Sequence, residues 1–340
     1  MLKVIEAGLQ SSVQDLGRHG QRHQGIAQCG ALDSVALRTA NLLVGNPADC
    51  ATIEIQGGRV VLQLERDGNI ALCGQGFFLA IGSAAPSDPH QMTSHRPLVV
   101  KQGETLHITP RRGGSGSSGG GRSYLAVDGG LDVAQVMGSR ATDLHGGFGG
   151  GAGRALRDGD LLPLGPASGY TAPDTIATRP LLPGWHIRAL VGPEQPQLGS
   201  ERAETFWSSD WQIGNDSNRM GCRLRGEASE TLRDAARAEI NSHGVVPGTV
   251  QLPRNGQPIV LLADGQTTGG YPRIATVIAA DLWRLAQMPQ GQPFRFVRCS
   301  AEQAVAALRQ QQQQLYRLQL ASQAIYKQQP TTRRQQGEQR

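Results

Sequence analysis

The sequence predicts a mainly β protein with two domains. Glycine accounts for 45 of the 340 residues, nearly twice the usual ~7%, which favours many tight turns over a helical bundle. At roughly 150 residues per domain, the length fits two domains that can each bury a core. Short apolar runs bounded by Gly, Pro, Asp or Asn recur in both halves. This pattern favours β-barrels over a doubly wound sheet.

The first predicted domain, residues 1–165, contains a series of short strand-like runs. Val60, Leu62 and Leu64 alternate with their neighbours, which suits a sheet with one buried face. One helix interrupts the series, because Asp33 can cap its start and the Gly-Asn-Pro run at 45–47 ends it. The predicted strands are 59–64, 69–72, 77–81, 98–100, 106–109 and 124–127.

Residues 166–184 contain four prolines and few apolar residues, so we predict that they form the inter-domain linker. A second β-rich domain is expected at 185–300. Its predicted elements are strands at 186–191, 249–252, 259–263, 273–279 and 293–297 and a short helix at 281–287. The last segment, residues 301–340, is predicted to begin as a helix and to end as a disordered, Gln-rich basic tail.

The charge distribution argues against a nucleic-acid-binding protein. The formal net charge of +5 is carried entirely by residues 309–340, so the body of the chain is neutral. The five cysteines show no CxxC spacing, and neither a disulfide framework nor a metal site is expected. No apolar run approaches a signal peptide or the ~20 residues of a membrane span. We therefore expect a cytoplasmic protein with reduced thiols that binds neither nucleic acid nor a membrane.

Two glycine-rich segments imitate nucleotide and nucleophile motifs. The run 114–119 satisfies GxGxxG and 116–120 satisfies GxSxG, but neither lies between a strand and a helix. We interpret this region as a hairpin loop. The run 145–153 lacks the Lys-Ser/Thr ending of a P-loop; its backbone could cradle an anion, although a structural loop is favoured.

The polar segment from Asp264 to Arg273 carries the strongest functional signal. It lies between two apolar runs, where a rigid scaffold commonly presents function. Asp264 supplies a carboxylate, and Arg273 can clamp a carboxylate or phosphate with two hydrogen bonds. The alternative is a hairpin capped by Asp264, with Arg273 in a surface ion pair. The other candidate binding residues of this segment are Gln266, Thr267, Thr268, Gly269, Gly270 and Tyr271.

Two further turns offer candidate functional side chains. Asn218 and Arg219 present planar donors just before Gly221, although a plain turn explains them equally well. His243 is a candidate general base near neutral pH, while a hydrogen-bonded turn histidine is the commoner outcome. Turn formation and helix capping explain the polar runs at 14–18 and 30–33.

Six ordered motifs resemble the biotin-dependent carboxyltransferase-like family, also known as the allophanate hydrolase subunit 2 family. They are Ser12-Val-Gln-Asp-Leu-Gly-Arg18, Gly30-Ala-Leu-Asp33, Ala40-Asn-Leu-Leu-Val-Gly-Asn46, Ser217-Asn-Arg-Met-Gly221, Gly244-Val-Val-Pro-Gly248 and Gln266-Thr-Thr-Gly-Gly-Tyr-Pro-Arg273. The resemblance covers about residues 1–300 and implies two cyclophilin-like β-barrels. The sequence departs from the family at the Gly/Ser run 113–121, at Cys222, where an aromatic residue is frequent, and in its long tail.

The resemblance implies a component of an ATP-dependent 5-oxoprolinase, a hydrolase that opens the cyclic amide 5-oxo-L-proline to L-glutamate. It implies a tight complex with the B subunit of 5-oxoprolinase, with the A subunit completing the enzyme, and it implies ATP with Mg²⁺. On this hypothesis Asp264, Arg273 and His243 are catalytic, and Asn218, Arg219 and residues 266–271 bind substrate or ATP. No P-loop is present, so we expect any nucleotide site to be shared with the B subunit.

Two alternatives remain open. One is carboxyl transfer from carboxybiotin to a urea-like amide, although no Met-Lys-Met-like carrier site is present and biotin is not expected on this chain. The other is a non-catalytic protein that regulates a kinase inhibitor. Because the charged tail lies beyond the family motifs, we expect removal of the chain from about residue 302 to leave assembly and turnover intact.

Overall fold

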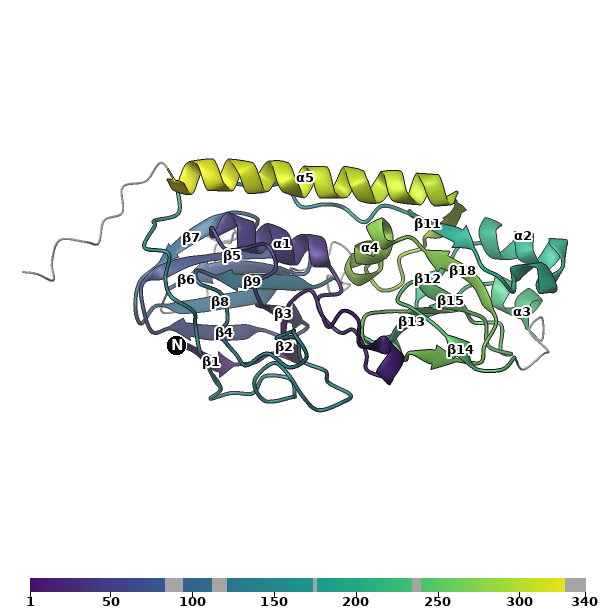
Figure 1. The fold of residues 1–340 in the computed structure, drawn as a ribbon, viewed down its shortest axis with the longest axis horizontal. Helices are drawn as coiled ribbons and strands as arrows, with labels where there is room; N and C mark the ends of the chain where they lie inside the picture. The colour runs from purple at the N-terminus through teal and green to yellow at the C-terminus, as the bar shows by residue number, and fades with distance from the viewer. Residues whose placement is uncertain (83–93, 112–120, 174–175, 234–239, 328–340) are drawn as a thin grey trace, which may run out of the picture. The chain divides into compact units, whose positions relative to one another are not determined.

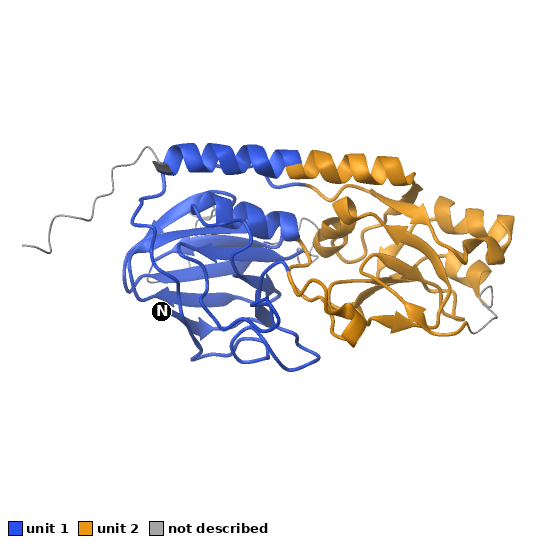
Figure 2. Cartoon of the chain, in the orientation of Figure 1, with its two compact units in different colours: residues 1–16, 34–181, 313–340 blue, residues 17–33, 182–312 orange. Residues whose placement is uncertain are grey.

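The computed structural model describes residues 1–82, 94–111, 121–173, 176–233 and 240–327. The chain divides into two compact units, coloured separately in Figure 2. Unit 1 comprises residues 1–16, 34–181 and 313–340, and unit 2 comprises residues 17–33 and 182–312. The predicted fold class is confirmed: both units are built on β-sheets, with a few short helices and a C-terminal helix. The GxGxxG and GxSxG run and the end of the tail lie outside the described residues.

The described part of unit 1 contains two five-stranded antiparallel sheets (Figure 1). The first has the strand order β10-β1-β4-β8-β6. Its strands are β1 (Leu2–Glu6), β4 (Val60–Leu64), β6 (Phe77–Ile81), β8 (Thr105–Pro110) and β10 (Leu161–Leu162). The second has the order β2-β3-β9-β5-β7. Its strands are β2 (Gln10–Gln14), β3 (Thr52–Gln56), β5 (Gly68–Gly74), β7 (Pro97–Val100) and β9 (Ser123–Val127).

The two sheets of unit 1 share one apolar core. Leu62 and Leu64 of the first sheet and Ile53 and Leu125 of the second are fully buried in the same cluster. Such burial of alternating aliphatic side chains supplies most of the favourable free energy of folding. Helix α1 (Ser34–Leu43) packs on β5 and β9 through its own buried face.

The C-terminal helix α5 (Ala301–Lys327) is longer than the sequence indicated (Figure 1). Near its end, in unit 1, Ser322 Oγ donates a hydrogen bond of 2.5 Å to the carbonyl of Leu42. Tyr326 donates one of 2.7 Å to the carbonyl of Leu43. Both donors are buried, and burial raises the pKa of Tyr326 above its ordinary value. These bonds satisfy carbonyls at the end of α1 that have no partner within that helix.

The proline-rich segment predicted as a linker lies in unit 1 as far as residue 181. The backbone N–H of Ser168 donates to Asp128 Oδ1 at 3.0 Å, and that of Ala172 donates to Asn69 Oδ1 at 2.8 Å. Ala172 and Ile176 are buried. The segment is therefore held on the first unit by side-chain and backbone contacts.

Unit 2 is built on a seven-stranded sheet with the order β12-β13-β16-β15-β18-β11-β19. Its strands are β11 (His186–Val191), β12 (Gln212–Ile213), β13 (Gly221–Arg225), β15 (Thr249–Gln251), β16 (Ile259–Leu261), β18 (Arg273–Val277) and β19 (Arg295–Arg298). A small second sheet pairs β14 (His243–Gly244) with β17 (Thr268–Gly269). The described helices of this unit are η1 (Arg22–Gln24), η4 (Gln195–Leu198), α2 (Ser200–Ser208), α3 (Ala228–Leu232), η5 (Ala279–Asp281) and α4 (Leu282–Gln287).

Residues 17–33 belong to unit 2, so the first unit is not the continuous segment 1–165 expected from sequence. The N–H of Cys29 donates to the carbonyl of Ala263 at 2.9 Å. Leu32 is buried in the apolar core of unit 2, and Gln287 donates to Asp33 at 2.7 Å. These contacts explain why an early segment of the chain folds with the second unit.

None of the helices in the described ranges is long and apolar enough to cross a membrane. In the same ranges, no group of three or more His, Cys, Asp or Glu side chains is arranged to hold a metal ion. None of the five cysteines forms a disulfide.

Candidate functional site

The structure brings the predicted polar loop together with the His243 turn in unit 2. In the β14–β17 pair, His243 lies opposite Gly269 and Gly244 lies opposite Thr268. The N–H of Val245 extends this pairing with a hydrogen bond of 3.0 Å to the carbonyl of Thr267. Two segments that are distant in sequence therefore form one candidate site.

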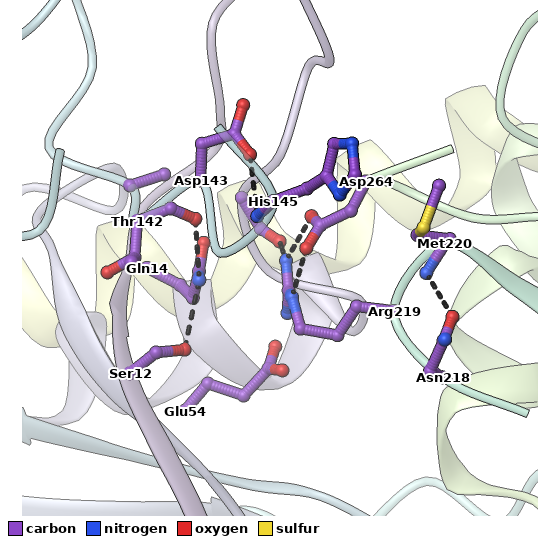
Figure 3. Close-up of polar contacts among 12 residues, drawn as sticks. Ser12, Gln14, Glu54, Thr142, Asp143, His145, Asn218, Arg219, Met220 and Asp264 are labelled. Atoms are coloured by element: carbon purple, nitrogen blue, oxygen red, sulfur yellow. Dashed lines mark hydrogen bonds and ion pairs between the residues drawn. The ribbon is translucent and has the colours of Figure 1, made fainter. Parts of the chain in front are cut away.

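Arg219 and Asp264 form a buried ion pair at the base of this loop (Figure 3). Arg219 Nε and Nη2 each lie 2.8 Å from one carboxylate oxygen of Asp264. Arg219 Nη2 also donates to the carbonyl of Gly30 at 2.6 Å. The two side chains are only 3% and 5% exposed. Their expected roles in ligand binding and acid–base chemistry stay predictions, and the geometry shows a pair that fixes the start of the loop.

Asn218 lies beside this pair in an exposed turn (Figure 3). Its side-chain oxygen accepts a hydrogen bond of 2.8 Å from the N–H of Met220. This local bond holds the turn that leads into β13. Ligand binding by Asn218 stays a prediction. The observed contact is the one that a plain turn would have.

Arg273 is also engaged by a carboxylate. Its Nε and Nη2 lie 2.9 and 2.7 Å from the carboxylate oxygens of Glu194, and its backbone N–H donates to the same carboxylate at 2.9 Å. Hydrogen bonding to Arg273 lowers the pKa of Glu194, and the same contact raises the pKa of Arg273. Arg273 is therefore in an ion pair, as the alternative interpretation of this segment expected. Its role in binding a ligand stays a prediction.

One ring nitrogen of His243 is hydrogen-bonded, and the other has no hydrogen-bond partner among the described residues. Its Nδ1 lies 3.1 Å from the carbonyl oxygen of Asn241, which can only accept a hydrogen bond, so we place the proton on Nδ1. Its Nε2 is buried and has no hydrogen-bond partner among the described residues. The charge that His243 carries when protonated is also a minor cause of the lowered pKa of Glu194. This arrangement is compatible with the predicted role as a base.

Gln251 is a buried amide of the site that the sequence did not reveal, because its position is that of an ordinary strand residue. Gln266 Nε2 donates to Gln251 Oε1 at 3.3 Å, whereas Gln251 Nε2 has no partner among the described residues. Gln251 is 1% exposed. A Cβ at Gly269 would overlap Gln251 Nε2, so this glycine leaves room for the amide.

Arg22 is a second residue that sequence reasoning missed. Its Nη2 donates to the carbonyls of Val245 and Gln266, both at 2.7 Å. Partial burial lowers the pKa of its guanidinium. The only signal in the sequence was a basic residue between two family motifs. The remaining candidates of the loop differ in access: Thr268 and Tyr271 are exposed, and Thr267 and Gly270 are partly buried.

Unit 1 contains polar clusters of its own (Figure 3). Gln14 Nε2 donates to Ser12 Oγ at 3.0 Å and to the carbonyl of Thr142 at 3.2 Å. Asp143 Oδ1 accepts from the N–H groups of His145 and Gly146 at 3.1 and 2.7 Å. These two bonds hold the start of the glycine-rich run 145–153 against the carboxylate of Asp143.

The comparisons with known proteins agree with the motifs. Residues 24–298 match the family described as carboxyltransferase domain, subdomain A and B. The chain is 48% identical over 321 residues to the C subunit of 5-oxoprolinase from Escherichia coli (strain K12), covering 94% of this chain and 98% of that protein. It is 34% identical over 304 residues to the corresponding C subunit from Haemophilus influenzae, covering 89% and 93%.

A solved structure is also similar. The urea carboxylase of Kluyveromyces lactis matches with a TM-score of 0.78 and 27% identity over 94% of this chain. This chain spans only 29% of that enzyme. With the fold, the ordered motifs and the family match in agreement, the chain belongs to the family of carboxyltransferase domains with subdomains A and B.

Proposed function

We propose that this chain is one component of an ATP-dependent 5-oxoprolinase, which opens 5-oxo-L-proline to L-glutamate. The observation that carries the proposal is the 48% identity to a 5-oxoprolinase C subunit, over 94% of this chain and 98% of that protein. The match with the yeast urea amidolyase is weaker, at 30% identity and 17% of that protein. Because the match spans 98% of the C subunit but only 17% of the urea amidolyase, it supports the 5-oxoprolinase role over that of the larger enzyme.

The chemistry requires activation of the amide. A lactam carbonyl is a poor electrophile, and transfer of the γ-phosphoryl group of ATP to its oxygen makes the carbon reactive. Water then attacks that carbon and the ring C–N bond breaks, which leaves an acyl phosphate on the opened chain. A second water releases phosphate and L-glutamate, so ATP and two waters are consumed for each ring opened.

We assign roles to the residues that the structure leaves accessible or unpartnered. His243 Nε2 is suited to take a proton from the attacking water, because its lone pair has no other described partner. Gln266 and Thr268 are exposed and can orient the lactam by hydrogen bonds. The ion pairs of Arg219 and Arg273 position the two ends of the loop. Any step performed on ATP and Mg²⁺ would also need groups from the B and A subunits.

The experiment is reconstitution of the enzyme. The chain is mixed with the B and A subunits of 5-oxoprolinase, and L-glutamate release from 5-oxo-L-proline and ATP is measured. We expect stoichiometric formation of glutamate and ADP that depends on this chain. Arg273→Ala should lower the rate at least tenfold, because the loop loses its anchor to Glu194. Omission of the chain without loss of turnover would refute the proposal.

Carboxyl transfer is the second candidate, supported by the structural similarity to urea carboxylase. Its test supplies a carboxylated biotin carrier and urea in place of ATP and 5-oxo-L-proline. Formation of a carboxylated urea only in the presence of this chain would favour this candidate. The same assays decide on a regulatory role, because a purely regulatory protein would support neither reaction.

A further inference from the structure

Arg22 carries a positive charge that no carboxylate of the described residues neutralises. Its Nη2 is held by two main-chain carbonyls at 2.7 Å, and its Nη1 is buried without a hydrogen-bond partner in the described part of the chain. The other arginines of this site are neutralised: Arg219 pairs with Asp264 and Arg273 pairs with Glu194. The site therefore has a local excess of one positive charge, and burial without a counter-ion is costly.

Gln251 provides a second unpartnered donor in the same site. It is 1% exposed, and its Nε2 finds no partner among the described residues. The orientation of its amide is fixed, because Gln251 Oε1 accepts the hydrogen bond from Gln266. A buried N–H₂ group without an acceptor has given up its hydrogen bonds to water and has gained none in return, which costs free energy. Such a cost is expected where a ligand supplies the missing acceptor.

Gln266 connects these two donors. Its main-chain carbonyl accepts from Arg22, and its side chain donates to Gln251. The Arg22 guanidinium and the Gln251 amide are therefore each hydrogen-bonded to the same residue of the loop. Gly269, which lies against Gln251 Nε2, keeps that region free of a side chain.

We propose that Arg22 and Gln251 form an oxyanion receptor that binds a carboxylate or phosphate group of the ligand. This inference rests on the proposed function, in which 5-oxo-L-proline supplies a carboxylate and ATP supplies phosphates. Arg22 provides the charge and one donor, and Gln251 provides a neutral donor. Arginine is suited to this task because its planar fork matches the geometry of an oxyanion.

The test measures KM values of the reconstituted three-component enzyme for 5-oxo-L-proline, for ATP and for 2-pyrrolidinone, the same lactam without its carboxylate. If the substrate carboxylate is bound, Arg22→Gln raises the KM for 5-oxo-L-proline roughly tenfold or more and leaves those for 2-pyrrolidinone and ATP unchanged. If a phosphate is bound, Arg22→Gln raises the KM for ATP instead. Either result supports the receptor, and the substrate affected identifies its anion.

Two variants control for indirect effects, and a third tests Gln251 itself. Arg202→Gln, on the surface of α2, should leave every KM unchanged. Cys29→Ser should do the same, because burial rather than Cys29 is the main cause of the lowered pKa of Arg22. Gln251→Met should raise the KM for the same ligand as Arg22→Gln. If Arg22→Gln does not fold, this variant alone tests the receptor. Unchanged KM values in Arg22→Gln and Gln251→Met, or equal effects in Arg202→Gln, would overturn the inference.

The receptor can fail independently of the proposed function. If the wild-type enzyme releases glutamate and the variants match it, only the receptor is refuted. If the wild-type enzyme releases no glutamate, calorimetry of the complex with 5-oxo-L-proline and with ATP replaces the KM values. Arg22→Gln must then weaken the binding of 5-oxo-L-proline or of ATP. Unchanged binding of both ligands overturns the receptor.

Discussion

The guanidinium of Arg219 holds both carboxylate oxygens of Asp264 at 2.8 Å in the interior of unit 2. Because the pair is buried, removal of one partner leaves an uncompensated charge. We predict that Asp264→Asn lowers the free energy of unfolding by about 3–5 kcal/mol. Urea unfolding of the purified chain measures this change.

The matched control is Asp216→Asn, because Asp216 is half exposed and pairs with Arg223 and Arg225 on the surface. This variant should cost about 0–1 kcal/mol. If Asp264→Asn were as stable as the wild type but inactive, Asp264 would act in chemistry rather than in positioning the loop.

Stability should depend on pH through His95, which is buried in unit 1. The N–H of Gly74 donates to His95 Nε2 at 3.2 Å, so that nitrogen must be unprotonated. Burial, with a smaller effect of Arg111, lowers the pKa of His95 from 6.5 to about 4. The folded state therefore binds fewer protons than the unfolded chain between these values.

It follows that stability is lost as the pH falls from about 6.5 to about 4, by up to roughly 3 kcal/mol. His95→Gln keeps an acceptor for Gly74 and should flatten this part of the pH profile. Urea unfolding between about pH 7.5 and about pH 4 gives the profile, with the exposed His186→Gln as control. A profile of His95→Gln identical to that of the wild type would contradict this assignment.

The two glycines of the β14–β17 pair should respond differently to substitution. A Cβ at Gly269 would overlap the side-chain amide of Gln251, whereas one at Gly244 would meet open space within 4 Å. Gly269→Ala should therefore displace that amide and raise the KM for the affected ligand roughly fivefold or more. Gly244→Ala should have no such effect. Equal KM values in the two variants would show that the amide of Gln251 does not contribute to ligand binding.

Tyr326 should stabilise unit 1 although it lies far beyond the family motifs. Its hydroxyl donates to the carbonyl of Leu43, and its ring is buried. Tyr326→Ala should lower the free energy of unfolding by about 3–5 kcal/mol. Tyr316→Ala, on the exposed side of the same helix at 59% exposure, should change it by less than about 0.5 kcal/mol.

This contact also revises the expectation about truncation. Removal of the chain from about residue 302 would delete Ser322 and Tyr326 together, so we now expect loss of stability rather than an intact protein. Equal melting temperatures for the full chain and for a chain ending at residue 312 would contradict the packing of α5 on α1.

Local sequence patterns predicted most of the long elements. The runs 77–81 and 186–191 match β6 and β11 residue for residue, because a short apolar or alternating run between turn residues is a local signal. Two-residue strands such as β14 and β17 carry no such signal and form only through each other. The assignment of residues 17–33 to unit 2 depends on tertiary contacts, which no periodicity encodes.

The candidate site was predictable to a similar degree. The concentration of polar residues between two apolar runs identified the loop 264–273, and His243 was found as a titratable residue in a turn. The partners of these residues were not predictable. Glu194, Gln251 and Arg22 meet the loop through the fold alone, and each lies in ordinary strand, turn or surface sequence.

The discontinuous composition of the two units has a consequence for biosynthesis. Residues 17–33 leave the ribosome long before residues 182–312, with which they form unit 2, and unit 1 is incomplete until residues 313–327 have been made. Neither unit can therefore finish folding during translation in the simple N-terminal-first order that is usual for consecutive domains. The early segment must wait unpaired, and folding of both units is tied to contacts of high sequence separation, which slow it.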